Sequence, residues 1–269
     1  MSVNPINTKE LEILAPALFT QEPHSDTSDK YHFIKTIDVI EEIKANNWYP
    51  VSVKVSNVRD EEKEGFQQHC VRFRHFEDLL NPKDNAVELL LFNSHDRTKA
   101  FSISAGIFRF ICANGLVLAD SVFETYKIKH LGERDNDVAN AVNQITAIKD
   151  KLMNKINTLS NIKLSQLEKE SFAKLSVPLR FEEHLEINHT DLLTPLRDED
   201  YKDDLYTTLN VIQENLIRGN ISGINKESGR RFTSKEIKAI STDTHINKGL
   251  WDIAEKIAFI KEPNYKIAA

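Results

Sequence analysis

The sequence predicts an α+β protein, in which a small antiparallel sheet with a short buried helix is followed by long helices and a helical C-terminal part. Residues 71–74 and 101–105 alternate apolar and polar side chains, as half-buried strands do. Residues 137–162 repeat apolar side chains every three or four positions, as an amphipathic helix does. Hydrophobic residues are 40% and charged residues 28% of the chain, which is an ordinary globular composition.

The first elements follow a polar lead-in over residues 1–30 that shows little pattern. Isoleucines three positions apart in 37–43 predict a short amphipathic helix, which ends at the Asn46-Asn47 pair. Strands are then predicted at 51–58 and 69–76 because both segments are rich in β-branched and alternating residues. An acidic break that contains a glycine separates them, so they form an antiparallel ribbon.

The most patterned part of the chain predicts a second hairpin. A continuous apolar run at 87–92 is one strand, 93–99 (NSHDRTK) is a polar turn, and 101–105 is the returning strand. The apolar residues of 106–112 fit a buried helical segment that an Asn-Gly pair ends. Strand character resumes at 116–120, so the layout is strand, strand, helix, strand.

Residues 137–162 predict about seven turns of one amphipathic helix. Such a helix is too long for the small sheet to cover, so it needs a further partner. An intrachain helical hairpin with 164–175 and a coiled coil between subunits are both open. Pro178 ends this helical region.

The remaining third of the chain is predicted to be helical. Apolar residues at helical spacing in 205–217 precede a Gly219-Asn220 stop, a polar loop spans 221–240, and a final helix lies around 250–260. The resulting division is a lead-in at 1–30, an α+β core with the long helix at 31–178, and a helical region at 179–269, which can pack as one domain with the core.

Composition also indicates where the protein resides. No apolar run approaches the roughly 18 residues that span a bilayer, and the N-terminus lacks a signal-peptide pattern. Cys70 and Cys112 lie in apolar contexts without CxxC spacing, which favours buried reduced thiols. We therefore expect a cytoplasmic protein without a membrane partner. Its net charge is −6, and residues 181–204 concentrate 9 acidic against 2 basic side chains.

Motifs for cofactors and metals are not found. The sequence has neither GxxxxGK[ST] nor GxGxxG, so no nucleotide cradle of these types is predicted and no cofactor is expected. The acidic run at 197–204 lacks the Gly and terminal Glu of a calcium loop and fits a solvated helix N-terminus better. The histidines show no spacing typical of zinc sites; they include His69, His75, His130, His184, His189 and His245.

The enzyme candidate is the His95-Asp96 pair in the polar turn, because loops on rigid hairpins often carry catalytic groups. Neighbouring side chains on a turn seldom face one another, and no nucleophile has a recognisable elbow. We therefore favour a turn in which Asn, Ser and Asp bond their own backbone, and we do not predict an enzyme.

Three segments, 90–116, 192–220 and 241–255, resemble in order the pattern of the family called domain of unknown function 932. Its members include the YfjQ and YafZ type proteins of prophages and plasmids. The resemblance implies residence in a mobile element, near genes for DNA maintenance or for resisting host defence. A small β-β-α-β sheet before a long helix is also similar in outline to the Redβ and Erf type annealing proteins, which bind single strands on oligomeric rings.

Cations on predicted strands and loops indicate a nucleic-acid site. Residues two apart on a strand share a face, so each such pair offers two charges to phosphates, and nearby Phe or Tyr could stack bases. An ordinary strand with one charged face explains the same pattern. The candidate binding residues are Arg72, Arg74, Arg97, Lys99, Lys127, Lys129, Arg230 and Arg231.

These observations favour a non-enzymatic DNA-binding protein, which self-associates through its long helix and holds single-stranded DNA for annealing or protection. The alternative is an anti-defence protein that binds a host defence or DNA-processing enzyme, with residues 181–204 as an acidic DNA mimic. A metal-dependent nuclease or other hydrolase that uses His95 and Asp96 is the third hypothesis.

Overall fold

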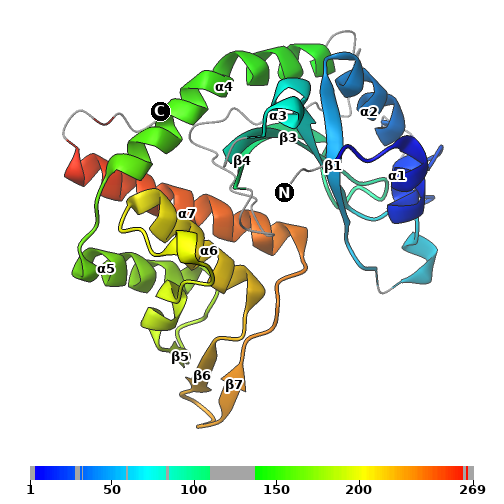
Figure 1. The fold of residues 1–269 in the computed structure, drawn as a ribbon. Helices are drawn as coiled ribbons and strands as arrows, with labels where there is room; N and C mark the ends of the chain where they lie inside the picture. The colour runs from blue at the N-terminus through cyan, green and yellow to red at the C-terminus, as the bar shows by residue number, and fades with distance from the viewer. Residues whose placement is uncertain are drawn as a thin grey trace. The chain divides into compact units, whose positions relative to one another are not determined.

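The computed structural model describes residues 4–27, 31, 33–58, 60–82, 85–109, 137–262 and 265 (Figure 1). Their contacts divide the chain into two compact units. The first unit holds the described residues up to 109 together with 137–150, and the second holds those from 151 onward. The division therefore falls inside a helix, earlier than the boundary near residue 178 that the sequence suggested.

Helices and strands follow in mixed order, and the class is α+β as predicted. The α-helices are α1 (Thr8–Leu14), α2 (Thr36–Ala45), α3 (Phe76–Leu80), α4 (Asp137–Asn161), α5 (Gln166–Ser176), α6 (Leu205–Arg218) and α7 (Ile240–Lys261). The strands are β1 (Trp48–Val55), β2 (His69–His75), β3 (Asn85–Asn93), β4 (Ser102–Arg109), β5 (Leu185–Ile187), β6 (Ser222–Asn225) and β7 (Arg231–Thr233). Short 3-10 turns are η1 (Pro16–Phe19), η2 (Glu61–Lys63), η3 (Val177–Leu179), η4 (His189–Leu193) and η5 (Asp198–Asp200).

The first unit is built on a four-stranded antiparallel sheet in the order β1-β2-β3-β4. Val71, Leu91 and Ile103 lie side by side across three strands, and Phe73 and Leu89 form the next row of the same face. All five side chains are buried. The two predicted hairpins are confirmed, and they join into one sheet through the pairing of β2 with β3.

The predicted helix at 106–112 is wrong where the structure describes it. Residues 106–109 continue β4, with Gly106 opposite Glu88 and Ile107 opposite Val87. A continuous apolar run fits a buried strand as well as a buried helix, and pairing with β3 decides the matter here. Residues 110–112 and the strand predicted at 116–120 lie outside the described residues.

Two helices precede the sheet. The predicted helix at 37–43 is α2, which packs on β1 and ends at Asn46 and Asn47, the latter with a φ of 64°. The other helix, α1, lies in the supposed patternless lead-in. It begins with a capping box, in which the Asn7 side chain accepts from the backbone N–H of Glu10 while the Glu10 carboxylate accepts from that of Asn7.

The long helix α4 is continuous, as its periodicity predicted. Trp48 Nε1 donates to Thr146 Oγ1 at 3.1 Å, and the Lys149 ammonium lies 2.7 Å from the Asp78 carboxylate. Because a single chain already buries the apolar stripe of α4, this stripe offers no open surface for a coiled coil between subunits. The predicted hairpin partner, α5, lies mainly against α7 and η4. The buried stripe comprises Val138, Ala141, Val142, Ile145, Leu152, Ile156 and Leu159.

The second unit packs α5 and α7 against α6, which is buried along nearly its whole length. The Asp204 side chain begins α6 by accepting from the backbone N–H of Thr207 at 2.7 Å. Gly219 and Asn220 end it with φ values of 78° and 61°. The acidic run therefore leads into a helix N-terminus, and the predicted stop is confirmed.

Across the described ranges, no helix combines the length and apolar character that a bilayer span requires.

Candidate nucleic-acid interface

Arg72 and Arg74 are interior residues, which corrects their assignment as phosphate contacts. Arg72 Nε donates to Glu88 Oε2 at 2.5 Å, and Arg74 Nη2 donates to Glu88 Oε1 at 2.6 Å. The side chains of Arg74 and Glu88 are each 1% exposed. Both arginines lie on the central strand β2, where the non-core face is also covered, so alternation of charged and apolar residues did not mark a solvent-facing side.

Arg97 and Lys99 belong to the predicted turn at 93–99, which bonds its own backbone as expected. The Asp96 carboxylate accepts from the backbone N–H and the hydroxyl of Thr98 at 3.0 and 2.6 Å, and Ser94 Oγ accepts from Lys99 N. Arg97 is exposed with a φ of 65°, whereas Lys99 is half-buried with Nζ 5.5 Å from the Phe92 ring centre. Lys127 and Lys129 lie outside the described residues.

The enzyme candidate His95 is buried, with its ring beside that of His69. His69 Nε2 lies 2.8 Å from Thr36 Oγ1, and His95 Nε2 lies 3.4 Å from the same oxygen. Asn93 Nδ2 also donates to this hydroxyl at 3.0 Å. All four side chains are buried.

Burial sets the protonation of this cluster. It lowers the pKa of His69 to about 3, with a smaller contribution from the neighbouring His95. Burial alone would raise the pKa of Asp96, but hydrogen bonds from Thr98 outweigh it and lower that pKa. His69 is therefore neutral, and the Asp96 carboxylate of the turn is ionised. No group of three or more His, Cys, Asp or Glu in the described ranges is arranged to hold a metal ion.

Arg230 and Arg231 lie on a feature that the sequence did not predict. The expected polar loop contains the β6–β7 hairpin, which pairs with β5 into a three-stranded sheet. The Asn225 side chain accepts from the backbone N–H groups of Glu227 and Ser228, each at 3.0 Å, and Gly229 has a φ of 66°. These are ordinary turn contacts, and with them a polar segment closes a hairpin.

The base of the hairpin is fixed to the end of α6. Asn220 N donates to Ser234 O at 2.8 Å, and Ile237 N donates to Ile217 O at 2.8 Å. A Cβ added at Gly219 would lie 2.7 Å from the backbone of Lys235, so only glycine allows this close approach.

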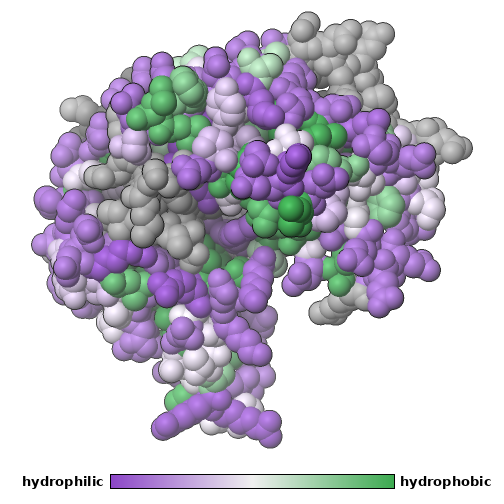
Figure 2. Space-filling model, turned by 45° about the vertical axis from the view of Figure 1, so that its right-hand side comes forward, coloured by the Kyte–Doolittle hydropathy of each residue, from purple (hydrophilic) through white to green (hydrophobic). Residues whose placement is uncertain are grey.

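Five cations project from this hairpin and the segment that follows it, and we call them the hairpin cations. All five are exposed, and among the residues that the structure describes none of them forms an ion pair. Figure 2 shows the projecting hairpin, at the bottom of the view, as mostly hydrophilic. The hairpin cations are Lys226, Arg230, Arg231, Lys235 and Lys238.

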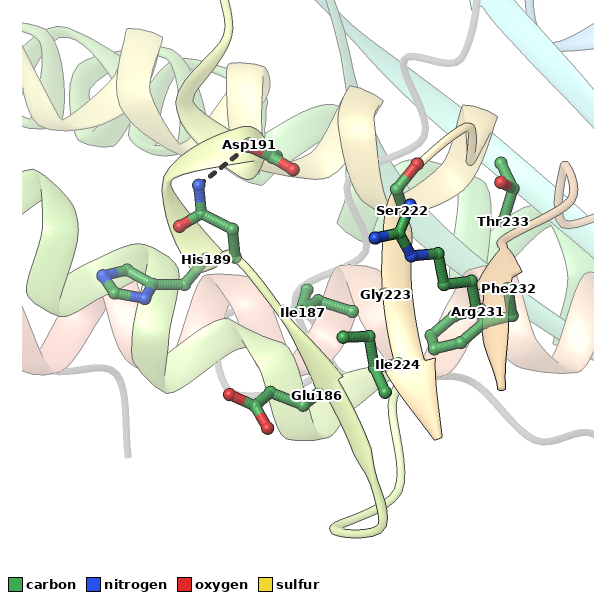
Figure 3. A pocket seen from close by; sticks show the side chains of 11 residues that line it. Glu186, Ile187, His189, Asp191, Ser222, Gly223, Ile224, Arg231, Phe232 and Thr233 are labelled. Atoms are coloured by element: carbon green, nitrogen blue, oxygen red, sulfur yellow. Dashed lines mark hydrogen bonds between the residues drawn. The ribbon is translucent and has the colours of Figure 1, made fainter. Parts of the chain in front are cut away.

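An open groove of about 820 Å³ lies along the three-stranded sheet (Figure 3). Arg231, Ile224 and Glu186 line it from the three strands, and His189 and Asp191 line it from η4. One wall is therefore cationic and the other acidic.

The acidic stretch at 181–204 is only partly a surface feature. Asp200 is buried and accepts from Arg197, and Asp204 is buried as the cap of α6. Asp203 pairs with Lys169. The negative surface is therefore smaller than the net charge of this stretch suggested.

Polar side chains of the family-like segments mainly join elements of the interior. Glu214 of α6 accepts from Arg197 at 2.6 and 2.7 Å and from Arg218 at 3.1 Å. Asn247 of α7 bonds Gln213 of α6 and donates to Asp243 Oδ1 at 2.6 Å. These hydrogen bonds explain why polar residues stand within the helical patterns of these segments: their side chains hold elements of the fold together.

Comparison with known proteins agrees with the resemblance seen in these segments. A family model described as Domain of unknown function (DUF932) matches residues 23–251. The chain is 31% identical to UPF0380 protein YafZ and 30% identical to UPF0380 protein YfjQ, both of Escherichia coli (strain K12), in each case over 94% of this chain and 92% of the relative. No solved structure gives a significant match. The chain belongs to the DUF932 family.

Proposed function

We propose that this protein binds DNA in the cytoplasm, with a preference for single strands, and that the hairpin cations contact the phosphates. The observation that carries the proposal is that five exposed cations within 13 residues form no ion pair in the described part of the chain. Exposed charges without protein partners are available to neutralise phosphates, and the overall charge of −6 does not prevent local attraction.

The groove beside the hairpin supports the preference for single strands. Ile224, an apolar side chain that lines it, is 45% exposed. An unpaired base can lie against such apolar groups, whereas a base in a duplex cannot. Annealing or protection of single strands in a mobile element is the role that such binding would serve, and it requires no reaction at His95 or Asp96.

Fluorescence anisotropy with labelled single-stranded and duplex oligonucleotides over a salt series tests this proposal. Five phosphate contacts predict that log affinity falls with log salt at a slope of about −3.5 for a single strand. Lys226→Ala with Arg230→Ala should weaken binding to every sequence and reduce that slope by about 1.4. The control is Lys174→Ala with Lys256→Ala, which removes two exposed charges from helices α5 and α7.

Absence of binding at low salt would refute the proposal and would favour the alternative in which the protein inhibits a host enzyme. Equal effects of the two double variants would show that nucleic acid binds elsewhere. Cleavage of the oligonucleotide with added magnesium, lost in His95→Ala, would instead show a nuclease.

A further inference from the structure

On the outer face of the three-stranded sheet, the order of charges from strand to strand is complementary to the same order read in the opposite direction. The strand register places Glu186 opposite Ile224, and Ile224 opposite Arg231. Directly opposed residues of antiparallel strands project from the same face. The three side chains therefore form one row across the sheet, which reads acid, apolar, base, and we call it the cross-strand row.

All three members of the row are exposed, and both neighbours in the next row, Ser222 and Thr233, are small, polar and exposed. Strands lie about 4.8 Å apart, so the backbones of Glu186 and Arg231 are separated by about 10 Å, and their side chains form no ion pair with each other. Neither forms an ion pair with any other residue that the structure describes. The row thus presents an unpaired acid from β5, an exposed apolar side chain from β6 and an unpaired base from β7, whose side chain reaches toward Ser222 (Figure 3).

We infer that this face associates with a second copy of the same chain. A two-fold axis that passes between the Ile224 side chains of the two copies would place Glu186 of each copy against Arg231 of the other. The two Ile224 side chains would then be buried together. The charges next to the outer strands have the same polarity, because the exposed Glu182 and Glu183 precede β5 and the exposed Arg230 precedes β7. The turn between β6 and β7 adds one exposed charge of each sign, Lys226 and Glu227.

The size of the face sets the expected affinity. Stable dimers bury roughly 800 Å² on each partner, which strands of three or four residues do not provide. Exposed ion pairs add about 0 to 1 kcal/mol each. We therefore expect a salt-sensitive dimer with a dissociation constant of roughly 100 µM. The long helix plays no part in this association, since its apolar stripe is buried within one chain.

Sedimentation of the full chain over a concentration series tests the inference, and no nucleic acid is present, so the result does not depend on the proposed function. The wild type should dimerise at low salt and dissociate at high salt. Glu186→Arg and Arg231→Glu should each abolish dimerisation, because each variant opposes two like charges. The control Glu12→Arg makes the same charge change on exposed α1 and should leave the dimer intact.

Mixing the two single variants gives the decisive result. The Glu186→Arg row has a basic side chain at both ends, and the Arg231→Glu row has an acidic side chain at both ends. These two rows are complementary, so the mixture should recover the wild-type dissociation constant. The double variant Glu186→Arg with Arg231→Glu reverses the row and should also dimerise. A monomeric wild type at low salt, or single variants that dimerise normally, would overturn the inference. Failure of the mixture to recover would refute the two-fold pairing, and a different occupant, such as a peptide, would then have to be sought.

Discussion

Removing the charge of Glu88 should destabilise the first unit more than any surface substitution. This carboxylate accepts from Arg72 at 2.5 Å and from Arg74 at 2.6 Å, and its side chain is 1% exposed. Glu88→Gln keeps the shape but leaves two guanidinium groups facing a neutral amide in the interior. Breaking a buried ion pair in this way costs about 3 to 5 kcal/mol. We expect a loss near the middle of that range, about 4 kcal/mol, since two charge-assisted hydrogen bonds are weakened.

Urea denaturation measures this loss if the signal comes from the first unit alone. The chain has two tryptophans, of which Trp48 lies in the first unit and Trp251 in the second. In a Trp251→Phe background, Trp48 fluorescence follows unfolding of the sheet. Glu77→Gln is the control, because that carboxylate is 75% exposed and its loss should change stability by less than about 0.5 kcal/mol.

A loss below about 1 kcal/mol for Glu88→Gln would show that the two arginines are solvated, and would return them to the set of possible phosphate contacts. Replacing Arg72, Arg74 and Glu88 together by apolar residues of similar volume should cost less than Glu88→Gln alone, because no charge then remains buried. The double variant Arg72→Glu with Arg74→Glu would bury three carboxylates together, so it would test folding and not binding.

Three further predictions concern the histidine cluster, α6 and the hairpin. The pKa of His69 is about 3 in the folded chain and 6.5 when the side chain is exposed, so the unfolded chain takes up the proton first as pH falls. The free energy of unfolding should therefore fall by up to about 5 kcal/mol as pH drops from 6.5 to about 3. Titration of His69→Gln should show a shallower fall. Glu214→Gln should destabilise the second unit by about 3 kcal/mol in a urea titration followed by Trp251 fluorescence, and an unchanged midpoint would contradict its assignment as a buried partner of Arg197. Gly219→Ala should accelerate amide hydrogen exchange at Ile237 more than Gly229→Ala does, because an added Cβ meets the Lys235 backbone at the first position and open space at the second.

Helical periodicity predicted α4 and α6 well, because each has one long apolar stripe, and α6 also has a clear end signal at Gly219 and Asn220. Periodicity predicted the wrong element at residues 106–109, because a continuous apolar run has no period that separates a helix from a strand. These residues form a strand because they pair with β3. The prediction that Arg72 and Arg74 face solvent is wrong, because a charged residue at every second position is also found in a strand whose charges pair in the interior. A signal was present, since Glu88 interrupts an otherwise apolar strand and an interior carboxylate needs a cation.

The candidate site was predicted in part. Charge counting found Arg230 and Arg231, but the segment around them reads as a loop because its strands are short and their outer residues polar. The hairpin depends on contacts between distant parts of the chain, such as Ser234 with Asn220. Local pattern cannot show such contacts, although the Asn225 and Gly229 spacing is a recognisable turn signal.

The turn between β6 and β7 offers a place for inserting foreign sequence. Apart from the chain neighbours of Gly229, no atom of the described residues lies within 4 Å of a Cβ built there, and the turn side chains on either side of it are exposed. A short epitope or a fluorophore attached there would project into solvent while the strands keep their pairing.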